Sequence, residues 1–124
     1  MAFEIPADFR VDEYKPHTLG DGFDGVPLQG SGSPGSPVSF YPKSKPSYVK
    51  PEIILSGDDD GNVYLFTAED DKDPSNWNYA YDSIFAAEGI VGTVSVKDVD
   101  GDNYEELFIP AYSQDELHIM TFAP

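Results

Sequence analysis

The sequence of residues 52–66 is EIILSGDDDGNVYLF, in which two apolar runs flank an acidic turn that contains glycine. Both runs are rich in β-branched or aromatic residues, which are typical of strands. An Asp-Gly pair between two such runs is a strong hairpin signal. We therefore predict two antiparallel strands, at 52–56 and 62–66. The adjacent carboxylates of Asp58, Asp59 and Asp60 do not alternate toward one point, so a plain turn is favoured there over a cation site.

The same pattern occurs a second time in the chain. When the sequence is shifted by 54 residues, 52–55 falls on 106–109, and 63–67 then falls on 117–121 without a gap. Self-similarity at a fixed spacing is typical of repeat architectures. The spacing predicts two units of about 50 to 60 residues, each with three or four strands.

The predicted fold class is all-β, with two antiparallel, propeller-blade-like repeats joined by a Gly/Ser/Pro-rich arm. No window of useful length has the period of an amphipathic helix. The expected division is 1–24 as the first strands of repeat one, 25–51 as the arm, 52–69 as the hairpin that completes repeat one, and 70–124 as repeat two.

The arm at 25–51 contains several X-Pro pairs, which disfavour both helix and interior strand. A flexible linker and an O-glycosylated Ser/Pro tract both remain open for this segment. The place in repeat one that corresponds to the acidic loop of repeat two is expected at 29–37, where no carboxylates occur.

The acidic loop of repeat two is the strongest functional signal. The run Asp98-Val99-Asp100-Gly101-Asp102-Asn103-Tyr104-Glu105-Glu106-Leu107 leads into an apolar strand. Carboxylates at relative positions 1, 3, 5 and 9 can converge on one hard cation, and Ca²⁺ takes six to eight oxygen ligands. The predicted ligands are the side chains of Asp98, Asp100, Asp102 and Glu106, with the backbone carbonyl of Tyr104. An acidic turn without a metal is the alternative.

The loop is not an EF-hand. The twelfth position is Ile109 rather than a bidentate Glu, and no helices are predicted on either side. The sixth position, where a positive φ favours Gly, is Asn103, which tolerates that conformation better than most residues.

The segment from Val94 to Pro110 resembles an FG-GAP (VCBS-type) repeat, the calcium-loop blade of integrin-like β-propellers. The resemblance lies in the strand 94–97, the loop 98–106 and the strands 107–110 and 116–120. It covers about the last 75 residues and departs from the family pattern at Asn103 and Glu106. It implies a calcium-binding blade in an extracellular or cell-surface protein.

The amino-acid composition of the chain excludes some kinds of binding partner. The chain has 23 acidic and 7 basic residues among 124, for a net charge of -16, which argues against nucleic acid and anionic membranes. No run of about 18 apolar residues occurs, so we expect no membrane insertion. Trp77, Tyr79 and Tyr81 alternate along one predicted strand, where inter-sheet packing is favoured over stacking on sugar rings.

Catalytic motifs are not evident. The chain has no Cys, no nucleophile elbow of the Gly-x-Ser-x-Gly type and no His-Glu-x-x-His zinc motif. We therefore expect no catalysis. Together with the resemblance to FG-GAP repeats, this implies a non-catalytic, extracellular, calcium-binding structural module that assembles with copies of itself, as a fibre or surface-layer subunit, or with another extracellular protein or glycan. The alternative is the C-terminal blade pair of a larger carbohydrate- or protein-binding propeller, as an adhesion domain or an accessory domain of a carbohydrate-active enzyme.

Overall fold

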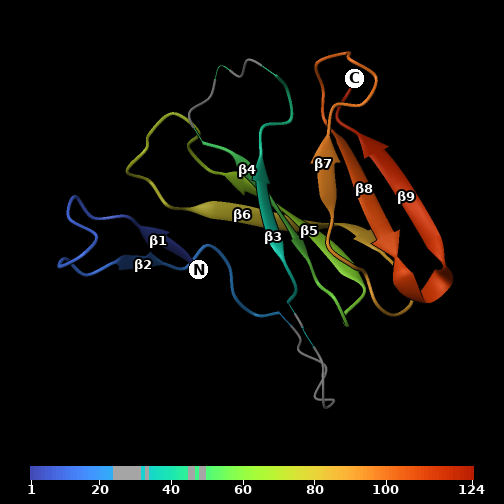
Figure 1. Ribbon diagram of the computed structural model, residues 1–124, viewed down its shortest axis with the longest axis horizontal. Helices are drawn as coiled ribbons and strands as arrows, with labels where there is room; N and C mark the ends of the chain where they lie inside the picture. Colours follow the sequence, from blue (N-terminus) through green and yellow to red (C-terminus); the bar gives the residue numbers. More distant parts are fainter. Residues whose placement is uncertain (24–31, 33, 45–46, 48–49) are drawn as a thin grey trace.

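The computed structural model describes residues 1–23, 32, 34–44, 47 and 50–124. These residues form three antiparallel sheets (Figure 1), so the all-β prediction is confirmed. The strands are β1 (Ala2–Glu4), β2 (Lys15–His17), β3 (Pro37–Phe40), β4 (Glu52–Ser56), β5 (Asn62–Ala68), β6 (Tyr79–Ala86), β7 (Ser95–Lys97), β8 (Glu106–Ala111) and β9 (Glu116–Thr121). A 3-10 turn at Tyr112–Gln114 joins β8 to β9.

The hairpin predicted from residues 52–66 is confirmed. β4 pairs with β5 from Ile53 opposite Phe66 to Ser56 opposite Val63. The turn reverses through positive φ angles of 57° at Asp58 and 73° at Gly61. A side chain at Gly61 would also collide with the Ala87 carbonyl, which explains the glycine there.

The strands reproduce the 54-residue spacing. β4 and β8 begin at Glu52 and Glu106, and β5 and β9 begin at Asn62 and Glu116. One side-chain contact is also repeated: Thr67 Oγ1 donates to Glu52 Oε2 at 3.5 Å, and Thr121 Oγ1 donates to Glu106 Oε1 at 3.1 Å. The same sequence pattern therefore builds the same local geometry twice.

The sheets divide the chain differently from the expected ranges. β3 lies within the predicted arm, as an edge strand that begins at Pro37, a position where a missing backbone N–H is tolerated. β6 lies within the range expected for repeat two but pairs with β5, completing the order β3-β4-β5-β6. β1 and β2 form a sheet of their own. The 54-residue spacing relates the hairpins β4–β5 and β8–β9. It does not specify with which sheet β6, which lies between them in the sequence, will pair.

The core lies between the second sheet (β7-β8-β9) and one face of the first sheet (β3-β4-β5-β6). β3 runs beside β7 (Figure 1). Buried apolar side chains from both sheets meet there, namely Phe40, Ile54, Val63, Val91, Val94, Leu107 and Ile109. Val91 also bridges the sheets through its backbone, to Asp58 on one side and Ala111 on the other. Packing across this interface holds the β7–β8 connection against the end of β3, where Lys43 and Tyr104 form a bridge.

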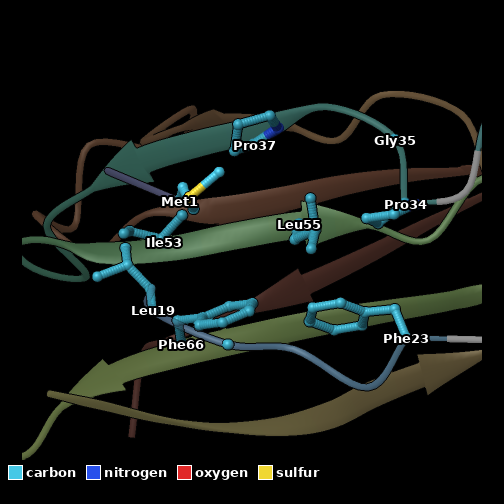
Figure 2. A pocket seen from close by; sticks show the side chains of 10 residues that line it. Met1, Leu19, Phe23, Pro34, Gly35, Pro37, Ile53, Leu55 and Phe66 are labelled. Carbon is cyan, nitrogen blue, oxygen red and sulfur yellow. The ribbon is translucent and has the colours of Figure 1, made fainter. Parts of the chain in front are cut away.

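The opposite face of the first sheet is aromatic and carries part of residues 17–23. The Phe23 ring lies 5.1 Å from both Tyr64 and Tyr81 and 6.1 Å from Phe66. An open cavity of about 300 Å³ remains beside this segment. Figure 2 shows Ile53, Leu55 and Phe66 projecting into it from β4 and β5. We call this surface the cavity face.

In the part of the chain that the structure describes, no helix has the length and apolar character needed to cross a membrane.

Candidate metal centre

The acidic loop connects β7 to β8 and is shaped by its own carboxylates. Asp98 accepts hydrogen bonds from the backbone N–H of Gly101 at 2.7 Å and of Asn103 at 3.1 Å. Asp100 and Asp102 each accept from the N–H two residues further on, at 3.1 and 2.8 Å. Such local side-chain-to-backbone bonds are typical of Asp in tight turns. They curl the loop around the Asp98 carboxylate.

The curl requires two left-handed backbone positions. Gly101 has φ of 82° and Asn103 has φ of 72°. Asn is among the few residues with a side chain that adopts this region readily. The expectation that Asn103 replaces the usual glycine without disrupting the turn is therefore confirmed for the backbone.

Three of the predicted ligands converge. Asp98, Asp100 and Glu106 each offer a carboxylate oxygen, and these oxygens all lie within 4.8 Å of one another. Glu106 is 6% exposed, although it carries a carboxylate. Its Oε2 accepts from the Val99 N–H at 3.0 Å, and its Oε1 accepts from the Thr121 hydroxyl at 3.1 Å. Glu106 therefore joins the start of the loop to β9.

The other two predicted ligands are placed differently. Asp102 is not in the converging group, and its Oδ1 accepts from the Tyr104 N–H. Tyr104 forms a β-bridge with Lys43, whose Nζ donates to the Tyr104 hydroxyl at 3.0 Å and lies over its ring. Tyr104 thus anchors the loop against the chain that follows β3.

The charge of the converging group suits a hard divalent cation. Among the described residues the ion pairs join Lys15 and His17 to Glu4 and His118 to Glu116, and none involves the loop carboxylates. Three carboxylates this close repel one another unless a cation neutralises them. All the groups are oxygen donors, which Ca²⁺ and Mg²⁺ prefer, whereas Zn²⁺ favours nitrogen and sulfur ligands.

The corresponding connection in the first sheet follows a different sequence. β3 pairs with β4 as β7 pairs with β8, so the counterpart of the acidic loop is 41–51, between β3 and β4. The expectation that it would lie at 29–37 is wrong, because β3 itself begins at Pro37. Burial raises the pKa of Glu52 at the end of this connection, while the Thr67 hydrogen bond opposes the rise.

The other acidic candidates have local roles. Asp60 accepts from the Asn62 N–H at 2.8 Å and from the Tyr64 hydroxyl at 2.7 Å, as expected for a hairpin turn. The sequence DGFDG at 21–25 is a second acidic stretch that contains glycine, but Asp24 and Gly25 lie outside the described residues.

The aromatic stripe is engaged within the chain. Trp77 stacks on His17 at 4.2 Å, and Tyr81 stacks on Phe66 at 5.0 Å. The Tyr79 hydroxyl donates to the Pro51 carbonyl at 3.2 Å. Burial raises the pKa of Tyr79. Contacts within the chain therefore account for these rings. Among the described contacts, only Trp77 reaches another sheet, through His17 of β2, whereas Tyr81 packs on its cross-strand partner Phe66 in the same sheet.

One contact of the candidate site was not recognised from the spacing alone. Thr121 secures Glu106 from a neighbouring strand, and only β8–β9 pairing brings the two residues opposite each other. The repeat contains a signal that could have found it, because Glu52 and Thr67 recur 54 residues later as Glu106 and Thr121.

Comparison with protein-family models, with curated proteins and with solved structures gives no match to this chain. The class of protein is therefore defined by the fold and the loop: an all-β chain of stacked antiparallel sheets with an acidic candidate cation site.

Proposed function

We propose that this chain is a non-catalytic, extracellular structural module whose second sheet is stabilised by Ca²⁺. The convergence of Asp98, Asp100 and Glu106 carries the proposal, because it offers three hard oxygen ligands within 4.8 Å of one another. Backbone carbonyls and water would complete the shell. The resemblance to FG-GAP repeats supports the same assignment, together with the extracellular or cell-surface location.

The ion would act by tying the β7–β8 connection to the sheet. Asp98 and Asp100 lie early in the connection, while Glu106 begins β8 and bonds to Thr121 of β9. An ion held by these carboxylates would restrain the loop and two strands together. Since this site depends on the folded arrangement, the binding free energy becomes stability: about 2.7 kcal/mol when free Ca²⁺ is 100-fold above Kd.

The first test is thermal unfolding of the Asp100→Asn variant in Ca²⁺ and in chelator. We expect the variant to melt well below the parent in Ca²⁺, because one charged ligand is lost, and to melt within a degree or two of it in chelator. Glu13→Gln removes the same charge at an exposed position away from the loop and serves as the control. Equal losses in both buffers, or an equal loss in the control, would contradict the calcium assignment.

A second candidate function is the blade pair of a larger propeller. It is favoured by one observation: apolar side chains lie on the outward faces at both ends of the sheet stack. Closed propellers contain about four to eight blades, so further sheets from outside this chain would be needed. A chain that remains monomeric and marginally stable in Ca²⁺ would favour this candidate over an assembling subunit.

A further inference from the structure

The second sheet has an apolar face that points away from the core. Leu107 and Ile109 of β8 are buried against the first sheet, so the alternate residues Phe108 and Pro110 lie on the opposite face. Cross-strand pairing puts Ile119 opposite Phe108 and Leu117 opposite Pro110 on that same face. Leu117 is 61% exposed and Ile119 is 60% exposed. We call this surface the outer face.

The internal repeat indicates what such a face packs against. The counterparts of Phe108, Pro110, Leu117 and Ile119, each 54 residues earlier, are Ile54, Ser56, Val63 and Leu65. Ile54 and Val63 are fully buried, and Leu65 is packed against the same core. What covers them is the second sheet. The outer face of the second sheet is thus equivalent to the side of the first sheet that the second sheet covers.

The cavity face of the first sheet corresponds to the side of the second sheet that packs against the first sheet. Its residues Ile53, Leu55 and Phe66 are the counterparts of Leu107, Ile109 and Met120. In the second sheet those positions face the first sheet, and Leu107 and Ile109 are buried by it. On the first sheet, the segment 20–23 packs on Phe66, which is 4% exposed, but no further sheet covers the three positions among the described residues. They line the open cavity of about 300 Å³ together with Met1, Leu19 and Phe23 (Figure 2).

We propose that the outer face of one molecule packs against the cavity face of a second copy. The intermolecular contact would repeat the contact that already joins the two sheets within the chain, with Leu117 and Ile119 seated at the cavity. A second copy is the occupant because this chain presents both halves of one interface at opposite ends of its sheet stack. Such a contact joins different surfaces, so it propagates into a head-to-tail row unless its rotation closes a ring.

This inference rests on the proposed structural function, for which it names the assembling surfaces. The net charge of -16 opposes association, so contact between the two apolar faces should strengthen as salt screens the repulsion. A contact held by surface ion pairs would respond in the opposite sense. Ionic strength therefore tests the apolar character of the interface independently of any substitution.

The experiment is sedimentation velocity of the full chain in Ca²⁺ over a wide concentration range, with two blocking variants. Leu117→Lys with Ile119→Lys blocks the outer face, and Pro34→Lys with Pro37→Lys blocks the exposed rim of the cavity face. We expect the average mass of the parent to rise with concentration and salt. Each variant should associate at least tenfold more weakly. Because each variant keeps one intact face, a mixture of the two should form a heterodimer and nothing larger.

The control carries the same added charge at exposed positions of the β1–β2 connection, Phe9→Lys with Val11→Lys, and should assemble as the parent does. A parent that stays monomeric, blocking variants that assemble normally, or a mixture without heterodimer would each overturn the proposal. Calcium-dependent melting of the outer-face variant separates the two proposals. If Ca²⁺ still raises its Tm, loss of assembly leaves the calcium assignment intact.

Discussion

The two hairpins β4–β5 and β8–β9 share a sequence pattern but differ in what surrounds them. Val63 is buried, whereas its counterpart Leu117, 54 residues later, is 61% exposed. Both are apolar residues at the same position of an antiparallel hairpin. The difference shows that the pattern specifies an apolar face on each sheet, while the presence of a neighbouring sheet decides whether that face is buried.

The two hairpins also differ in the chain segment that precedes each of them: the first strand begins with an equivalent glutamate in both, but the residues before it are different. Glu52 and Glu106 occupy equivalent positions, and each accepts a hydrogen bond from the equivalent threonine. Before Glu106 the connection supplies Asp98, Asp100 and Asp102, whereas the connection before Glu52 has no acidic residue. The same position in the fold is therefore a candidate metal ligand in the second sheet, whereas in the first sheet it is a half-buried carboxyl with no acidic residue in the connection before it.

The largest expected effect on stability comes from replacing an isoleucine by alanine, and it should differ between the two sheets. Ile54→Ala removes a fully buried side chain and should cost about 2–5 kcal/mol of unfolding free energy. Ile119→Ala, on the exposed outer face, should cost within about 0.5 kcal/mol when the chain is dilute enough to be monomeric. Urea unfolding of both variants measures the contrast. Similar losses would mean that the outer face is covered even in the monomer.

An effect of intermediate size is expected on Ca²⁺ affinity, and it should differ between Asp98 and Asp102 of the acidic loop. Asp98→Asn should weaken Ca²⁺ binding about tenfold or more, since a tenfold loss corresponds to about 1.4 kcal/mol. Asp102→Asn should weaken it less, because Asp102 lies outside the converging group. Calorimetric titration of each variant gives both affinities. A larger loss for Asp102→Asn would mean that the loop rearranges around the ion, toward the ligand set predicted from the spacing.

The smallest effect concerns the pH dependence of the two equivalent glutamates. Burial raises the pKa of Glu52, so the folded state holds its proton more tightly than the unfolded state. Its stabilising contribution is present below the ordinary value of 4.5 and is lost as pH rises through the raised pKa. Glu52→Gln should therefore gain on the parent between pH 4 and 7, by at most about 0.5 kcal/mol.

Melting curves across that pH range test the change at Glu52. Glu106→Gln is the matched comparison, and in Ca²⁺ at pH 7 it should melt lower than the parent because it loses a candidate ligand. A Glu52→Gln variant that loses stability relative to the parent as pH rises would contradict the argument from burial.

Much of the fold could be predicted from local pattern. Alternating apolar residues around Asp-Gly predicted the β4–β5 hairpin, and the 54-residue shift predicted that β8–β9 would repeat it. The spacing of carboxylates on alternate residues of the loop predicted Asp98, Asp100, Asp102 and Glu106 as one ligand set, and all of these except Asp102 converge. These features depend on neighbours within a few residues, which the sequence displays directly.

Other features depend on contacts across long sequence separations. The 54-residue repeat did not predict the pairing of β6 with β5. This strand lies between the two repeated hairpins in the sequence, so it could have paired with either sheet. The exclusion of Asp102 from the converging group depends on the turn geometry, in which its carboxylate bonds to the Tyr104 N–H.

The sequence by itself determined that the chain forms antiparallel hairpins, that two of them are related, and that one carries a loop of hard oxygen donors. Periodicity, turn residues and ligand spacing are local properties, so they can be read from the order of the residues. Only the tertiary structure decided which apolar faces are buried and which remain exposed. That choice depends on how the two sheets stack, because a side chain is buried by its neighbours in space rather than by its own pattern.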